Sequence, residues 1–94
     1  MISVNTAKYI DNYELQLTFN NGKEAMVNLE DMVVNDRRKI FIELKDIARF
    51  KDFKVEHSTV VWSNDLDLAP EYLFYLAFKE DKSFQCRFKQ WGYI

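Results

Sequence analysis

The stretch YELQLTFNNGKEAMVNL (residues 13–29) decides the fold of this chain. Apolar and polar residues alternate on both sides of Asn20–Gly22, which is the period-two pattern of strands with one face in a core. A two-residue turn would place apolar residues opposite polar ones, whereas a three-residue loop keeps the apolar side chains on one face. The pattern therefore predicts an antiparallel hairpin with Leu15 opposite Val27 and Gly22 in the left-handed conformation.

A second hairpin is predicted from the stretch FKVEHSTVVW (residues 53–62). A turn at residues 57–58 sets Phe53 opposite Trp62, so their side chains join one apolar patch and the indole lies in the core. Residues 2–10 contain β-favouring residues with a weaker alternation. They are predicted to form an N-terminal strand at or near a sheet edge.

Helical patterns occur between the hairpins and after them. Phe41, Leu44 and Ile47 recur at helical spacing, which predicts a short connecting helix over one face of the sheet. Pro70 suits the first position of a helix and Glu71 its positive end, so a helix near residues 69–80 is expected. The apolar run at residues 72–78 is equally compatible with a buried strand, and its periodicity does not decide between the two.

The size and composition of the chain predict one folded domain. Its 94 residues are 48% hydrophobic and include only two glycines and one proline, which is far from the composition of disordered chains. This length accommodates one core, and no repeat or linker divides the sequence. We therefore predict a single domain over residues 1–94 of the α+β class, with an antiparallel sheet built from the two hairpins and the N-terminal strand.

Charge and cysteine content favour some partners and compartments over others. The formal net charge is −2 and the pI is about 5.3, so no overall basic field favours nucleic acid as a partner. The N-terminus lacks a basic region followed by an apolar run, and the longest apolar run is too short to span a membrane. Cys86 is the only cysteine, so the chain has no internal disulfide and suits a reducing compartment. We expect a cytoplasmic protein that does not bind membranes.

Three stretches, at residues 12–32, 40–55 and 59–73, together resemble a small bacterial family catalogued as domain of unknown function 2442. They read NYELQLTFNNGKEAMVNLEDM, IFIELKDIARFKDFKV and TVVWSNDLDLAPEYL. The resemblance covers roughly residues 1–78, although Ser63 stands where the family usually has proline and Asp65 where it has glycine. It implies a small α+β fold without assigned catalytic residues. It also implies a gene arrangement resembling that of toxin–antitoxin pairs, because members are often encoded beside other small proteins.

Asp65 and Asp67 are the candidate metal ligands, because carboxylates suit Mg²⁺ or Ca²⁺. A calcium loop would need a further oxygen ligand and a glycine where the chain has Ala69 and Pro70. A turn followed by a helix start explains both aspartates without a metal. We therefore predict no metal site and no cofactor, and keep a small metal-dependent hydrolase or nuclease using both aspartates, with His57, as the alternative.

The C-terminal stretch DKSFQCRFKQWGYI (residues 81–94) lies beyond the family resemblance. Phe84, Cys86 and Phe88 alternate with polar residues, which predicts a strand, and Cys86 is expected to act as a small apolar side chain. Trp91 and Tyr93 follow where an unanchored tail is usually polar. The tail either adds an edge strand to its own sheet or docks on a partner by strand addition.

These patterns favour a non-catalytic protein-interaction domain over an enzyme. No nucleophile, base and orienting group can be assembled from the sequence around the single histidine, His57. The candidate interaction residues are the aromatic ones of the tail, namely Phe84, Phe88, Trp91 and Tyr93. The expected partner is another protein or a second copy of the chain, including the role of an antitoxin-like partner of another small protein.

Overall fold

The first three strands form the hairpin and the N-terminal edge strand predicted from the sequence. A computed structural model, which describes residues 1–35, 38–63 and 66–94, has an antiparallel sheet of order β1–β2–β3. β1 spans Val4–Asp11, β2 spans Glu14–Phe19 and β3 spans Glu24–Asn28. Leu15 pairs with Val27, and Gly22 has a φ of +82°, so the predicted three-residue loop is confirmed.

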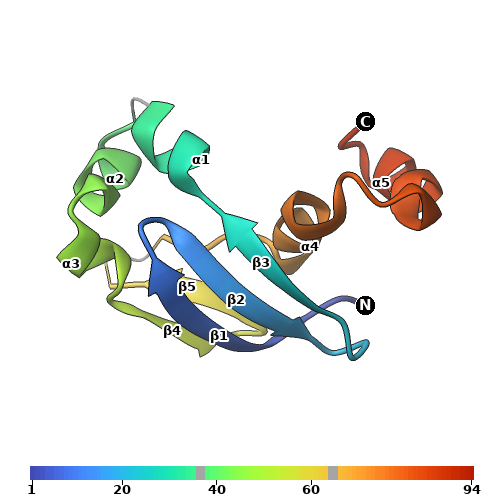
Figure 1. Cartoon of the computed structure of the whole chain (residues 1–94), viewed down its shortest axis with the longest axis horizontal. Helices are drawn as coiled ribbons and strands as arrows, with labels where there is room; N and C mark the ends of the chain where they lie inside the picture. Colours follow the sequence, from blue (N-terminus) through green and yellow to red (C-terminus); the bar gives the residue numbers. More distant parts are fainter. Residues whose placement is uncertain (36–37, 64–65) are drawn as a thin grey trace.

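The second hairpin also has its predicted register but forms a sheet of its own. In β4 (Phe53–Glu56) and β5 (Thr59–Trp62), Phe53 pairs with Trp62 and Val55 with Val60. The α+β class is confirmed, but the strands divide between a three-stranded and a two-stranded sheet. The sheets meet where the amide of Val4 donates to the carbonyl of Ser58 at 2.8 Å, and β4 lies beside β1 in Figure 1. Residues 66–67 cover the other edge of β5, where Val61 bridges to Asp67 and the Trp62 amide donates to the Leu66 carbonyl.

Several short helical turns connect the two hairpins. They are α1 (Glu30–Asn35), α2 (Lys39–Ile42), the 3₁₀ helix η1 (Glu43–Lys45) and α3 (Ile47–Phe50). Asp46 separates η1 from α3, and its side chain caps α3 by accepting a hydrogen bond from the Ala48 amide at 3.0 Å. The predicted apolar stripe still reaches the core, because Phe41, Leu44 and Phe50 are buried.

The apolar run after Pro70 is a helix, which settles the alternative that periodicity left open. α4 spans Pro70–Phe78 and has proline in its first turn, as predicted for a helix near residues 69–80. Leu73 and Phe74 are fully buried, and α4 packs beside β3. The residues that follow α4 in the chain pack against this helix.

The tail is helical, so the strand predicted for it is wrong. Residues Lys82–Phe84 form the 3₁₀ helix η2 and Gln85–Trp91 form α5, which ends at Gly92 with a φ of +86°. The alternation of Phe84, Cys86 and Phe88 coincides with a second pattern, in which Phe84, Phe88 and Trp91 recur every three to four residues on one helix face. Cys86 is exposed, contrary to the apolar role expected for it.

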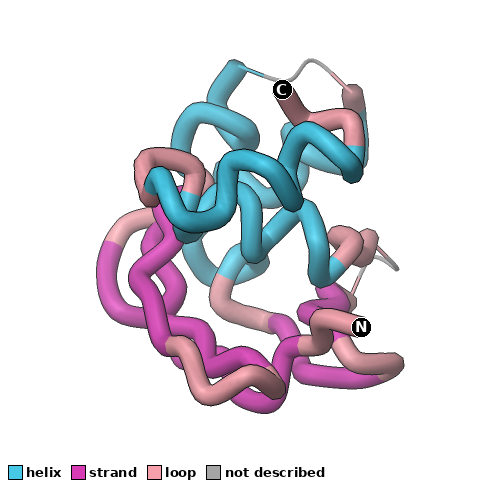
Figure 2. The backbone as a smooth tube through the Cα atoms, turned by 90° about the vertical axis from the view of Figure 1, so that its right-hand side faces the viewer, coloured by secondary structure: helices cyan, strands magenta, loops and turns pink. Residues whose placement is uncertain are grey.

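The core lies between the strands and the helices, which gather on one side of the strands in Figure 2. Trp62 is 1% exposed, and its indole nitrogen donates to the carbonyl of Phe50 at 2.8 Å. The buried apolar side chains form one cluster, and its largest fully buried members are Trp62, Phe19, Phe50, Phe74 and Phe88. Over the described ranges, no helix has both the length and the apolar character needed to cross a bilayer.

Candidate functional site

The alternative acidic site, made of Asp65 and Asp67 with His57, falls partly outside the part of the chain that the structure describes. His57 is exposed at the turn of the second hairpin, with a φ of +54°, and Asp67 is exposed where it bridges to Val61. Asp65 lies outside the described residues. Among the residues described, no three His, Cys, Asp or Glu side chains are arranged to hold a metal ion. Within the described residues, His57 and Asp67 are therefore not part of a cluster of such side chains.

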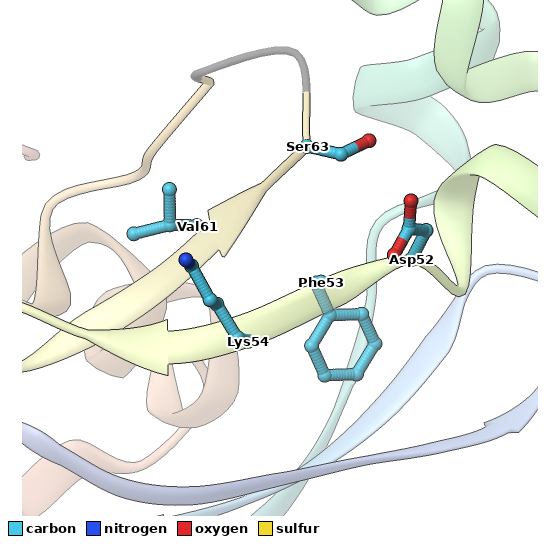
Figure 3. A pocket seen from close by; sticks show the side chains of 5 residues that line it. All are labelled: Asp52, Phe53, Lys54, Val61 and Ser63. Atoms are coloured by element: carbon cyan, nitrogen blue, oxygen red, sulfur yellow. The ribbon is translucent and has the colours of Figure 1, made fainter.

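A hollow of about 310 Å³ opens beside the second hairpin. Figure 3 shows Ser63 and Asp52 at one end of this hollow and Val61 and Lys54 at the other, with the Phe53 ring turned away from it. The Lys54 amine pairs with Glu56 at 3.3 Å, and both side chains are largely exposed. Among the described residues, the lining holds no histidine and one carboxylate, whereas a hydroxyl nucleophile or a metal ion needs further oriented groups. The described lining alone therefore does not form a catalytic constellation.

The four aromatic residues predicted as interaction residues meet α4 of their own chain. Phe88 is fully buried, whereas Phe84, Trp91 and Tyr93 are half-buried. The ring centroids of Phe84 and Phe88 lie 5.0 Å and 6.1 Å from that of Phe74 on α4. Such edge-to-face contacts hold α5 on α4. The tail thus packs on a helix rather than on the edge of a sheet.

Three tyrosines that lie side by side form a surface that the sequence reasoning missed. Tyr72, Tyr75 and Tyr93, here called the tyrosine face, are all half-buried. The ring centroid of Tyr93 is 5.6 Å from that of Tyr72 and 5.1 Å from that of Tyr75. None of the three hydroxyls has a hydrogen-bond partner among the described residues. The three-residue spacing of Tyr72 and Tyr75 would have placed them on one face had residues 72–78 been assigned to a helix.

The phenol of Tyr93 is held in an environment that disfavours its ionised form. Partial burial raises the pKa of Tyr93 above its usual value, and the nearby charge of Glu71 and the neighbouring Tyr72 add to the shift. Tyr93 is therefore neutral at physiological pH. Its hydroxyl, like those of Tyr72 and Tyr75, is available to donate or accept a hydrogen bond from a bound molecule.

A groove between α1 and α4 adjoins the tyrosine face and shares Tyr72 with it. The α1–α4 groove has a volume of about 370 Å³ and is lined by Asn28, Leu29, Asp31, Met32, Asn35, Tyr72, Leu76 and Lys79. A second hollow of about 410 Å³ shares Asn28, Asp31 and Asn35 with it and adds Glu30 and Val34. Together with the tyrosine face, these hollows make a surface that runs from α1 across α4 to Tyr93.

The comparisons with known proteins concern the region that ends with α4. A family model described as protein of unknown function (DUF2442) matches residues 4–79. Comparison with curated proteins and with solved structures gives no match. The matched region includes both hairpins, α1 and α4, whereas η2 and α5 follow it.

Proposed function

The chain belongs to the DUF2442 family of proteins of unknown function, and we propose that it is a non-catalytic protein-binding domain that acts through the tyrosine face. The role proposed for it is that of an antitoxin-like partner of another small protein in the cytoplasm. In this proposal residues 1–94 form one domain, and α5 completes the binding surface by supplying Tyr93. Phe84, Phe88 and Trp91 then support that surface, because their rings hold α5 on α4.

The observation that carries the proposal is the tyrosine face. Tyr72, Tyr75 and Tyr93 present half-exposed rings in mutual contact, together with hydroxyls that no described residue satisfies. A tyrosine buries a large apolar area with few rotatable bonds and still offers a hydrogen bond at its tip. For this reason tyrosines are enriched among the residues that dominate binding energy at protein interfaces.

The proposal is tested by isothermal titration of the chain with the protein encoded beside it. A variant carrying Tyr72→Ala and Tyr93→Ala is expected to bind about tenfold more weakly or worse, because hot-spot aromatics dominate such interfaces. Its matched control carries Thr6→Ala and Lys8→Ala, two exposed positions on β1. Equal affinities of the tyrosine variant and the control would contradict the proposal, as would the absence of binding by the unaltered chain.

The metal-dependent hydrolase is the competing function, and it can be tested separately. A metal ion that binds the native state must raise its stability, by an amount set by its concentration relative to the dissociation constant. We expect the melting temperature to stay unchanged in millimolar Mg²⁺, Mn²⁺ or Ca²⁺. A rise that disappears in the Asp67→Asn variant would favour the hydrolase.

A further inference from the structure

We propose that the α1–α4 groove binds an amphipathic helix of the partner protein, one that carries an aliphatic stripe flanked by lysine or arginine residues. This inference rests on the proposed function, because it names the partner chemistry that the same surface takes. Its support comes from the aliphatic side chains that line the groove, the ridge on α1, the surrounding charges and the packing of α5.

Three aliphatic side chains are among the mixed polar and apolar lining of the groove. Leu29 is buried, and Met32 on α1 and Leu76 on α4 are half-buried. The lining residues of α4 run from Tyr72 to Lys79, which spans about 10 Å, or two turns, along the helix axis. This length suits an apolar stripe with residues spaced three and four apart on a bound helix.

The side chains on the surface of α1 also suit the packing of a bound helix. Asp31 and Asn35 are one turn apart, and the Asn35 amide group donates a hydrogen bond to the Asp31 carboxylate. These two side chains line both hollows, so they form a ridge with the α1–α4 groove on one side and the second hollow on the other. Helices pack by placing such ridges between the side-chain rows of a neighbouring helix.

The charged side chains that the structure describes around the groove are mostly negative. Glu30 and Asp31 stand in the first turn of α1, and Glu71 stands in the first turn of α4, near enough to Tyr93 to raise its pKa. None of these three carboxylates makes an ion pair with a described residue. Among the residues that the structure describes, Lys79 is the one cation that lines the groove. A partner that places lysine or arginine beside its apolar stripe complements this rim, whereas an acidic partner is repelled.

α5, which carries Arg87 and Lys89, does not supply such a segment, which argues against α5 of a second copy as the occupant. The exposed positions of α5 are Cys86, Arg87, Lys89 and Gln90, and none of them is aliphatic. The apolar side of α5 is already engaged with α4, where Phe88 is fully buried against Phe74 and Tyr75. α5 of a second copy is therefore not the occupant, and the proposal assigns the groove to a helix from a different protein.

The test uses a surface-displayed library of amphipathic helical peptides whose flanking charges are randomised. The library is selected on the immobilised full-length chain, and each enriched peptide is then synthesised with a fluorophore for anisotropy measurements. We expect enriched peptides to combine aliphatic stripes with basic flanks. They should bind the Leu76→Glu variant about tenfold more weakly or worse. They should also bind Asp31→Lys more weakly, with a loss that shrinks as salt is added.

Two further variants make the test specific. Met26→Glu, at an exposed position on β3, is the control for adding a carboxylate and should leave binding unchanged. Asp31 is itself exposed, so Asp31→Lys reports on the groove even if Leu76→Glu disturbs folding. Circular dichroism of each variant separates loss of binding from loss of fold.

The inference is overturned if the library enriches nothing, enriches acidic or uncharged helices, or enriches peptides that bind Leu76→Glu and Asp31→Lys as tightly as the unaltered chain. Formation of dimers that the Leu76→Glu and Asp31→Lys substitutions abolish would also overturn it, in favour of a second copy. If the neighbouring protein binds both groove variants normally but not the tyrosine variant, the inference fails while the proposed function stands. If the tyrosine variant still binds both the neighbouring protein and the enriched peptides, the proposed function is contradicted instead.

Discussion

Trp62 combines burial with a specific hydrogen bond, and both are needed for stability. Its indole nitrogen donates to the Phe50 carbonyl at 2.8 Å, inside a core where its side chain is almost completely buried. Trp62→Phe removes that donor and leaves a buried carbonyl without its partner, so we expect a loss of about 2 kcal/mol in the free energy of unfolding. Urea denaturation measures this loss. The same change at half-exposed Trp91 should cost less, and equal losses would contradict this account.

The turn at His57–Ser58 is strained and can be improved. Both residues have a positive φ, of +54° and +69°. In two-residue hairpin turns, the two positions with a positive φ are usually occupied by Asn and Gly. Ser58→Gly relieves the strain at the second position, and we expect a gain of about 0.5–1 kcal/mol after the entropy cost of glycine. Ser63→Gly is the control, because Ser63 is exposed and is not among the positive-φ residues. A gain in the control, or none in Ser58→Gly, measured by denaturation, would contradict the prediction.

Among the secondary-structure elements, those defined by local patterns could be predicted and the tail could not. The register of each hairpin follows from the pairing of apolar residues, which is why Leu15 faces Val27 and Phe53 faces Trp62. In the tail, by contrast, the positions of Phe84 and Phe88 fit both a strand face and a helix face. The tail is helical because a third aromatic residue, Trp91, falls on the same helix face as these two, and its ring contacts that of Phe74 on α4.

The start of the C-terminal helical segment depends on the charge of Asp81. The Ser83 hydroxyl and amide both donate to the Asp81 carboxylate, at 2.7 Å and 2.9 Å, and these hydrogen bonds lower its pKa from the usual 3.8. A lowered pKa in the folded state contributes stability above about pH 4, and this contribution is lost as the pH falls through the folded value.

Asp81→Asn should therefore lower the melting temperature near neutral pH, and the difference from the unaltered chain should shrink as the pH falls below about 4. Thermal melts followed by circular dichroism at several pH values measure this difference. Glu80→Gln makes the same change in net charge one residue away and serves as the control. A deficit for Asp81→Asn that stays constant across the pH range would show that the carboxylate charge has no part in the cap.

In the whole molecule, α5 is expected to unfold together with the region matched by the family. Deleting residues 80–94 uncovers Phe74 and removes the buried Phe88, so unfolding should need at least about 2 kcal/mol less free energy. Chemical denaturation of the truncated chain measures the change, and deletion of residues 93–94 alone is the milder control. An unchanged midpoint after the longer deletion would show that α5 is an independent appendage.

The candidate surface was harder to predict than the fold because it is made by tertiary contacts. Tyr72 and Tyr93 are 21 positions apart in the sequence and meet only once both helices have packed. The sequence reasoning named Tyr93 as a candidate interaction residue, but it did not indicate which residues of the chain that side chain contacts. The α1–α4 groove likewise depends on how α1 sits beside α4, which no local pattern specifies.

The most direct measurement is a titration of the isotopically labelled chain with the proposed partner protein, followed residue by residue in amide nuclear magnetic resonance spectra. The account predicts that the largest shifts map to Met32, Tyr72, Leu76 and Tyr93, with the tip of the second hairpin unaffected. Shifts centred on His57 and Asp67, or an unchanged spectrum at saturating partner, would contradict it.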